Sequence, residues 1–491
     1  MRRDGRRAPT RNEAKASEHM QAPLHSLKNG AFAAALALLL CACADVSQKP
    51  YQTPATPDKG AWLSQKGLPI APGTMIALDW WKQFRDPYLD GLVERALGSN
   101  FDLKVLAARI RVANAEIGEA RAGALPTLDA GAGASFEKTT GEKFIKQFNL
   151  GTQVNWEIDV WGKVAKGVEA QTAEFRATEA DWRAGYLSLV SDVSTTYFQI
   201  MQFDEQIRQQ QQTLEKNQAI LATYEAMLGQ GLLPQTRVLQ QRAEINQLSR
   251  DLIELGRLRA LAGNALATLL GIPAGEFTVA PGSLQQRVQL PVVPEGLPSQ
   301  LLKRRPDIVA AEYRVLVAYD LVGQAKLAQL PSISLTGRGG TSSFALGDLL
   351  KSFTFGLLPS INFPIFDPSV KARLKTSEAR TEVAEAEYRR VVMAAFEEVE
   401  NALVNLDAHR RQRIELEQQA ERLGVVAAQV EAQMKEGMVS QLEVFESQRT
   451  LLSSQLALLA NHQQILSDTV LLYKALGGGW PPVDVQHAPQ E

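Results

Sequence analysis

Four short segments alternate apolar and polar residues, and they come in two pairs. We expect strands at 125–138 and 146–159 and, about 205 residues later, at 331–342 and 352–365. In the second strand one face would carry Phe148, Leu150, Val154, Trp156 and Ile158, and the other Gln147, Asn149, Gln153, Asn155, Glu157 and Asp159. This period of two is typical of strands that line a membrane β-barrel. Two solvated hairpins on a soluble core would show the same alternation, so the strands alone leave both interpretations open.

The segments that follow each pair of strands contain no proline. The proline-free stretches lie between Pro126 and Pro234 and between Pro368 and Pro481. Because proline is the residue that breaks helices, we expect uninterrupted helices at 163–229 and 371–436. At 1.5 Å per residue each helix would be on the order of 100 Å long, far longer than a globular core needs.

The two halves of the chain resemble each other. Residues 120–128 match 325–333, residues 224–232 match 430–438, and residues 269–271 match 475–477, at offsets of 205 or 206. Each half then reads as helix, strand hairpin, very long helix, turn and long helix. We therefore expect a mainly α-helical, internally duplicated chain with a small membrane β-barrel portion. Its segments would be a first repeat at 43–275, a Pro- and Gly-rich linker at 276–298, a second repeat at 299–480 and a disordered tail at 481–491.

The N-terminal region indicates export and lipid attachment. An apolar run at 31–40 suits a signal peptide and is too short to span a bilayer. It ends in Leu40-Cys41-Ala42-Cys43, which resembles a bacterial lipobox. We expect a signal peptide at 1–42 and an acylated Cys43, with either Met1 or Met20 as the start. An ordinary signal peptide with incidental cysteines is the alternative.

Composition argues against catalytic and nucleic-acid-binding roles. The five histidines are scattered, and none has the spacing of a metal site with cysteines or carboxylates. No cysteine follows Cys43, so the mature chain would form no internal disulfide. The net charge is −2 even with the basic leader included, which argues against nucleic acid as a partner. We expect no enzymatic activity, no cofactor and no metal.

Three further segments resemble the signature sequences of a known family. They are DWWKQFRDP at 79–87, RRPDIVAAE at 304–312 and LYKALGGGW at 472–480. With the lipobox and the repeats, they resemble outer-membrane efflux lipoproteins of the TolC family. The resemblance implies a homotrimer whose twelve strands form one outer-membrane barrel, continued through the periplasm by a barrel of twelve helices.

The function that this resemblance implies is that of a passive exit duct in a tripartite pump. The duct would export small molecules such as drugs, with a periplasmic adaptor and an inner-membrane transporter of the resistance-nodulation-division type as partners. The protein would be anchored in the outer membrane and extend into the periplasm. Two alternatives stay open: a duct for ABC-type protein secretion, and a lipid-anchored coiled-coil scaffold without a pore.

The resemblance also assigns roles to two turns and to the helix start beside the second turn. Adaptor contacts are expected at Gly231, Leu232, Leu233 and Pro234 and at Gly437, Met438, Val439 and Ser440. A gate is expected at Leu442, Glu443 and Glu446, where the family often has aspartates. From the residues alone, the glycines could serve only the turns, and the glutamates could form an ordinary solvated face. Arg449, one turn after Glu446, is the expected ion-pair partner.

Overall fold

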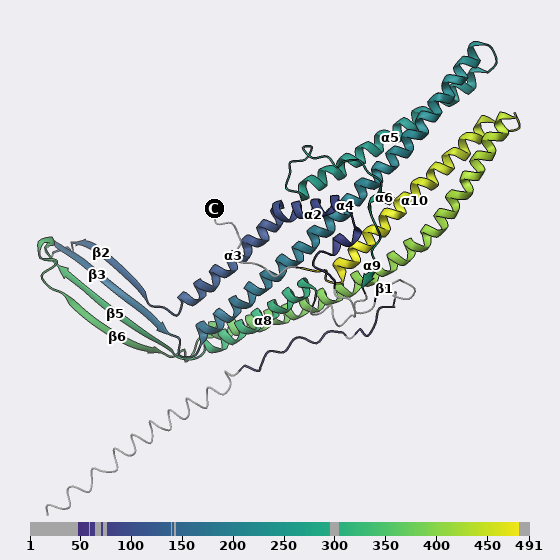
Figure 1. The fold of residues 1–491 in the computed structure, drawn as a ribbon. Helices are drawn as coiled ribbons and strands as arrows, with labels where there is room; N and C mark the ends of the chain where they lie inside the picture. The colour runs from purple at the N-terminus through teal and green to yellow at the C-terminus, as the bar shows by residue number, and fades with distance from the viewer. Residues whose placement is uncertain are drawn as a thin grey trace, which may run out of the picture. The chain divides into compact units, whose positions relative to one another are not determined.

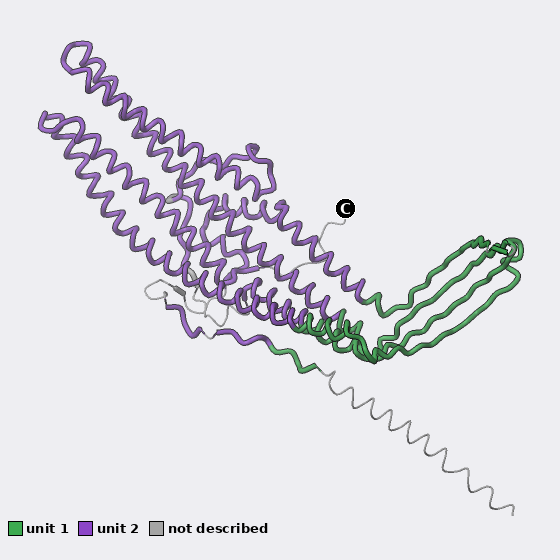
Figure 2. The backbone as a smooth tube through the Cα atoms, turned by 180° about the vertical axis from the view of Figure 1, so that it is seen from behind, with its two compact units in different colours: residues 1–52, 121–167, 319–378 green, residues 53–120, 168–318, 379–491 purple. Residues whose placement is uncertain are grey.

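A computed structural model describes residues 48–57, 59–63, 70–71, 76–138, 140–141, 144–294 and 304–480. The expected signal peptide at 1–42, the acylation site Cys43 and the tail at 481–491 lie outside these residues. The chain divides into two compact units, coloured separately in Figure 2. One unit comprises 1–52, 121–167 and 319–378, and the other comprises 53–120, 168–318 and 379–491.

The first unit contains a four-stranded antiparallel sheet (Figure 1). Its strands are β2 (Thr127–Glu137), β3 (Ile145–Ile158), β5 (Ser332–Ser343) and β6 (Thr354–Asn362), in the order β2-β3-β5-β6. The two predicted hairpins are confirmed, and the central pairing of β3 with β5 joins one hairpin to the other. The predicted end of the last strand was wrong. Phe363 and Ile365 lie beyond β6, because Pro364 has no backbone N–H with which to continue the ladder.

The second unit is mostly helical, and several of its helices continue into residues of the first unit. The helices are α2 (Pro87–Ser99), α3 (Phe101–Ala122), α4 (Lys163–Gly229), α5 (Gln235–Leu269), α8 (Pro306–Leu327), α9 (Pro368–Lys435) and α10 (Gln441–Ala475). Short elements of this unit are β1 (Ile70–Ala71), which pairs with β4 (Val293–Pro294), and the single turns η4 (Trp80–Phe84) and α6 (Leu284–Arg287). A further single turn, η5 (Leu346–Asp348), belongs to the first unit.

The predicted long helix at 163–229 is confirmed as α4. The second begins at 368 rather than 371, because proline is well tolerated in the first turn of a helix. Among the described residues, no helix is both long and apolar enough to cross a bilayer.

An aromatic cluster forms the core of the helical unit. Trp80 stacks on Tyr473 with 5.0 Å between ring centroids, and Phe84 lies 5.2 Å from Phe198. All four side chains are fully buried. Tyr197 donates a hydrogen bond of 2.6 Å to Asp86, which also caps the start of α2. The segment 79–87 therefore serves packing, since its aromatic residues join α4 to α10.

Two apolar stripes of the last helix, α10, are largely buried. Leu452, Leu459, Leu466 and Tyr473 on one stripe are buried, as are Val444, Ile465 and Leu472 on the neighbouring stripe. A helix with two apolar stripes contacts two neighbours, as in a wall of helices. Leu442 is the exception, since 59% of its side chain is exposed.

Candidate functional site

Both turns between long helices have the same hydrogen-bonding pattern. After α4, Gly231 N donates to Leu228 O and Leu232 N to Met227 O, both at 2.9 Å. After α9, Gly437 N and Met438 N make the equivalent bonds at 3.0 and 2.9 Å. Gly231 has φ +73° and Gly437 has φ +77°, the left-handed conformation that ends helices in this motif. The two glycines therefore have a structural role whatever else they do.

The residues after each glycine show matching exposure in the two repeats. Leu232 and Met438 are 66% and 63% exposed, whereas Leu233 and Val439 are half-buried. Pro234 and Ser440 are exposed at the N-cap positions, directly before α5 and α10 begin. Each tip thus presents one large apolar side chain to solvent, which suits contact with another protein.

Ser440 and Glu443 form a capping box at the start of α10. The Glu443 N–H donates to Ser440 Oγ at 3.4 Å, while Ser440 N donates to the Glu443 carboxylate at 3.1 Å. The spacing Ser440-x-x-Glu443 is a known sequence signal for a helix start. Glu443 was expected in the gate or on a solvated face, so its role in capping α10 was missed.

Glu446 and Arg449 form an ion pair, as expected from their spacing. The Arg449 guanidinium donates to both Glu446 carboxylate oxygens, at 2.7 and 2.9 Å. Glu244 on α5 belongs to the same charge cluster and was not predicted. Burial raises the pKa of the Glu244 carboxyl, an effect that Arg449 opposes and Glu446 reinforces. Glu244 and Arg449 line a hollow of about 390 Å³ between α4, α5 and α10.

Four buried polar side chains link α10 to the first helical hairpin. Gln241 Nε2 donates to Asn217 O and Oδ1, both at 2.9 Å. Gln441 Nε2 donates to Gln241 Oε1 at 3.5 Å and accepts a hydrogen bond from the Tyr224 hydroxyl. We call Asn217, Tyr224, Gln241 and Gln441 the tip network. Because buried polar groups require partners, these bonds fix the first turn of α10 against α4 and α5.

In the sheet, one face is apolar although it is exposed in the single chain. Leu128 on β2, Val154 on β3 and Leu357 on β6 lie in one row on this face, and all three are exposed. The opposite face carries polar residues such as Gln153, Asn155 and Thr336, as the alternation predicted. Contiguous exposed apolar surface of this kind is rare in soluble monomers. Lipid is a suitable environment for this face.

Aromatic residues gather near both ends of the sheet. At one end Phe136 lies 6.4 Å from Phe144 and 6.1 Å from Phe148, measured between ring centroids. At the other end the indole N–H groups of Trp156 and Trp161 donate to backbone carbonyls at 2.9 and 2.7 Å. Such girdles mark the two water interfaces of membrane barrels.

The described part of the chain has no group of three or more His, Cys, Asp or Glu residues that could hold a metal ion.

Comparison with known proteins gave one consistent result. A family model described as outer membrane efflux protein matches residues 92–272 and 297–478. The pyoverdine export outer membrane protein OpmQ of Pseudomonas aeruginosa is 31% identical over 471 residues, which cover 93% of this chain and 98% of that protein. The cation efflux system protein CusC of Escherichia coli O157:H7 is 31% identical over 459 residues, which cover 91% of this chain and 98% of that protein.

Solved structures show the same likeness. The outer-membrane channel OprN superimposes with a TM-score of 0.79 at 29% identity, covering 89% of this chain and all of that one. The open state of the MtrE outer membrane channel of Neisseria gonorrhoeae superimposes with a TM-score of 0.77 at 29% identity, covering 88% of this chain and 98% of that one.

Proposed function

The chain belongs to the outer membrane efflux protein family, and we propose that three copies of it form the passive exit duct of a tripartite pump. The duct exports small molecules such as drugs across the periplasm and the outer membrane. Twelve strands from three chains form one membrane barrel, and a barrel of twelve helices continues it. The repeats at 43–275 and 299–480, joined by the linker at 276–298, supply equal shares of both barrels.

The sheet is the observation that carries this proposal. It has one apolar and one polar face, and among the described residues its edge strands β2 and β6 pair on one side only. In hydrocarbon each unpaired backbone group costs several kcal/mol, so an open four-stranded sheet is not stable there. Pairing β6 of one copy with β2 of the next removes the edges. Eight strands would leave a lumen filled by side chains, whereas twelve leave room for water.

The height of the apolar band supports insertion in a membrane. Phe136 lies opposite Lys146 on β3, and Trp156 follows ten residues later on the same strand. At about 3.3 Å per residue and a tilt of about 40°, the two aromatic girdles are about 25 Å apart along the membrane normal. This is the height of the apolar band in outer-membrane barrels. A pore-free scaffold would have no use for such a band.

The helical tips supply the proposed contacts with a periplasmic adaptor, through which an inner-membrane transporter of the resistance-nodulation-division type provides the energy. The exposed Leu232 and Met438, each beside a glycine turn, are suited to docking. The gate comprises Leu442, Glu443 and Glu446, repeated three times around the axis. Acylated Cys43 anchors each chain in the outer membrane.

Among relatives, one is named for pyoverdine, one for cations and one for toluene. We propose that solute choice rests largely with the inner-membrane component, since relatives with different named solutes share the duct fold. A role in protein secretion with an ABC-type transporter is less favoured, because these relatives are named for small solutes.

Native mass spectrometry of the detergent-purified protein tests the assembly. We expect the mass of three chains. A stable folded monomer inserted in lipid would contradict the argument from open strand edges.

A further inference from the structure

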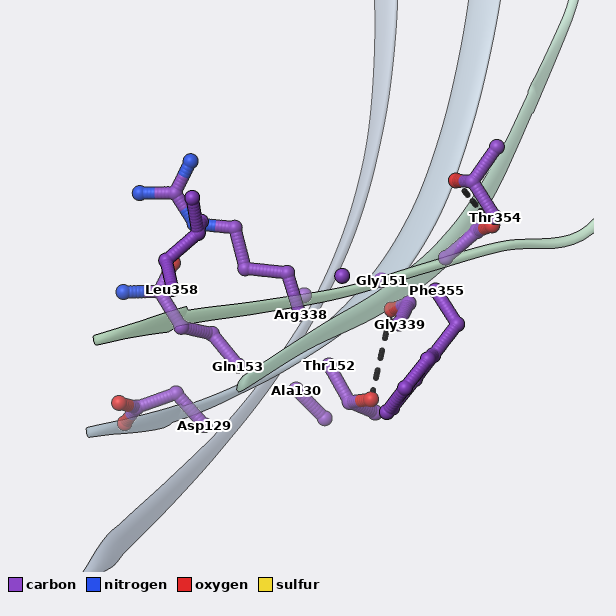
Figure 3. Close-up of a pocket in the computed structure, with 13 residues that line it drawn as sticks. Asp129, Ala130, Gly151, Thr152, Gln153, Arg338, Gly339, Thr354, Phe355 and Leu358 are labelled. Carbon is purple, nitrogen blue, oxygen red and sulfur yellow. Dashed lines mark hydrogen bonds between the residues drawn. The ribbon is translucent and has the colours of Figure 1, made fainter. Parts of the chain in front are cut away.

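Two opposite charges lie in one row across the polar face of the sheet. Residues directly opposite each other in the ladder are Asp129 on β2, Gln153 on β3, Arg338 on β5 and Gly356 on β6. We call these four residues the charge row. Residues that oppose each other in a ladder point to the same face, so Asp129 and Arg338 share the polar face, two strands or about 10 Å apart. Figure 3 shows the side chains of Arg338 and Gln153 beside each other.

Arg338 is the only cation on the polar face of the described strands. The acidic residues on that face are Asp129, Glu137 and Glu157. Glu157 is paired with Lys163 at 2.5 Å, and Asp129 accepts a weak bond of 3.5 Å from Asn155. The Arg338 side chain is exposed, and within the described part of the chain its guanidinium has no hydrogen-bond or ion-pair partner. It is therefore available to contact a solute.

The next row on the polar face, two residues further along each strand, leaves space beside the guanidinium. It contains Gly131, Gly151 and Gly340, which have no side chains. At Gly340 the lack of a side chain is required, since a Cβ there would lie 2.8 Å from Leu150 O. Several of these glycines line, with Asp129 and Arg338, a hollow of about 620 Å³ in the middle of the sheet (Figure 3).

We propose that Asp129 and Arg338 are specificity-determining residues of the duct, which balance each other so that the barrel admits anionic and cationic solutes alike. This inference rests on the proposed trimeric barrel, which repeats the charge row three times around the lumen. A solute of one charge sign is attracted by one residue of the pair and repelled by the other. Loss of either residue leaves three uncompensated charges of one sign.

The expected size of the effect follows from Coulomb's law with screening. Twelve tilted strands give a barrel with a backbone radius of about 12 Å. Three charges at that distance change the local concentration of a monovalent ion about threefold at ~10 mM salt, about 1.5-fold at ~150 mM, and hardly at ~1 M.

A cysteine reporter measures this potential without depending on the state of the gate. Gln153→Cys places a thiol between the two charges, in a mature chain whose only other cysteine is Cys43. The full-length protein in liposomes is treated with methanethiosulfonate reagents that carry either a sulfonate or a trimethylammonium group. The thiolate attacks the sulfenyl sulfur of either reagent, forms a disulfide and displaces methanesulfinate, so the ratio of the two rates cancels any change in thiol pKa.

Adding Arg338→Gln should lower the anionic-to-cationic rate ratio about tenfold at ~10 mM salt, and Asp129→Asn should raise it by a similar factor. Both effects should disappear at ~1 M salt, and the double substitution should restore the original ratio. Lys146→Gln is the matched control, because it removes a cation from β3 on the opposite face and should leave the ratio unchanged.

A second reporter separates failure of this inference from failure of the barrel. Val154→Cys lies one residue away on the apolar face and should not react with either charged reagent. Equal reactivity of the two reporters, or no reaction at Gln153→Cys, would overturn the barrel and the inference with it. If only Gln153→Cys reacts and neither charge substitution changes its rate ratio, the proposed barrel is supported, but the charge row does not influence which solutes pass.

Discussion

Gln241→Leu should loosen the start of the proposed gate helix. Gln241 is fully buried and lies at the centre of the tip network, between Asn217 on α4 and Gln441 on α10. Leucine has a similar volume, so the substitution removes hydrogen bonds without opening a large cavity. Asn217 and Gln441 then each lose one partner, while Asn217 keeps its bond to Thr213 O and Gln441 keeps its bond from the Tyr224 hydroxyl.

The magnitude follows from the bonds that are lost. Gln241 donates two hydrogen bonds of 2.9 Å and accepts a longer one of 3.5 Å. The two shorter bonds join α5 to α4, and only the 3.5 Å bond joins α5 to α10. Its loss leaves the buried Gln441 amide N–H without that acceptor, which costs the closed tip about 1 to 2 kcal/mol per chain. The ratio of loosened to closed tips should then rise about 5- to 30-fold per chain.

Single-channel recording in planar bilayers measures this change as open probability. Gln210→Leu is the matched control, because Gln210 is equally buried but donates to Leu248 O at 3.2 Å and so joins α4 only to α5. We expect more frequent opening for Gln241→Leu, little change for Gln210→Leu, and intact trimers for both. Equal open probability in the two variants would refute a role of the tip network in gating.

Three further experiments test other parts of the proposed duct. Arg449→Ala should raise basal conductance in bilayer recordings, since it frees Glu446 from its ion pair. Glu446→Gln should reduce the preference of the channel for cations. Unchanged ion selectivity would show that Glu446 lies on an ordinary solvated face and not in the gate. Gly231→Val or Gly437→Val should impair pump activity in drug-susceptibility assays, because both positions have positive φ and adjoin the proposed docking residues. If native mass spectra instead show that the trimers are lost, these glycines have only a structural role. Mass spectrometry of the mature N-terminus should find lipid on Cys43, and an unmodified N-terminus elsewhere would contradict the anchor.

The long helices and the strand hairpins could be predicted because their signals are local. The bounds of α4 follow from hydrophobic pattern and the absence of proline, and the faces of β3 follow from strict alternation. The end of β6 was misplaced, since apolar alternation continues past Pro364 while the hydrogen-bonded ladder does not. Alternation with a period of two does not show which strands lie next to each other. The pairing of β3 with β5 therefore became known only from the structure.

The tip network and Glu244 depend on contacts between distant helices. Gln241 and Gln441 are 200 residues apart, and each is a polar residue in a helix with many others. Their burial becomes apparent only when α5 and α10 are placed side by side. Glu443 is different, because the capping-box spacing from Ser440 is visible in the sequence and was overlooked in favour of the gate.

Single-channel conductance of the purified protein in lipid bilayers tests the central claim most directly. If three chains enclose a continuous lumen, trimers should insert and give discrete conductance steps, which occur more often in the Gln241→Leu variant. A lipid-anchored scaffold would bind the bilayer without passing current. Trimers that insert fully and never conduct, even with the tip network broken, would contradict the assignment as a duct.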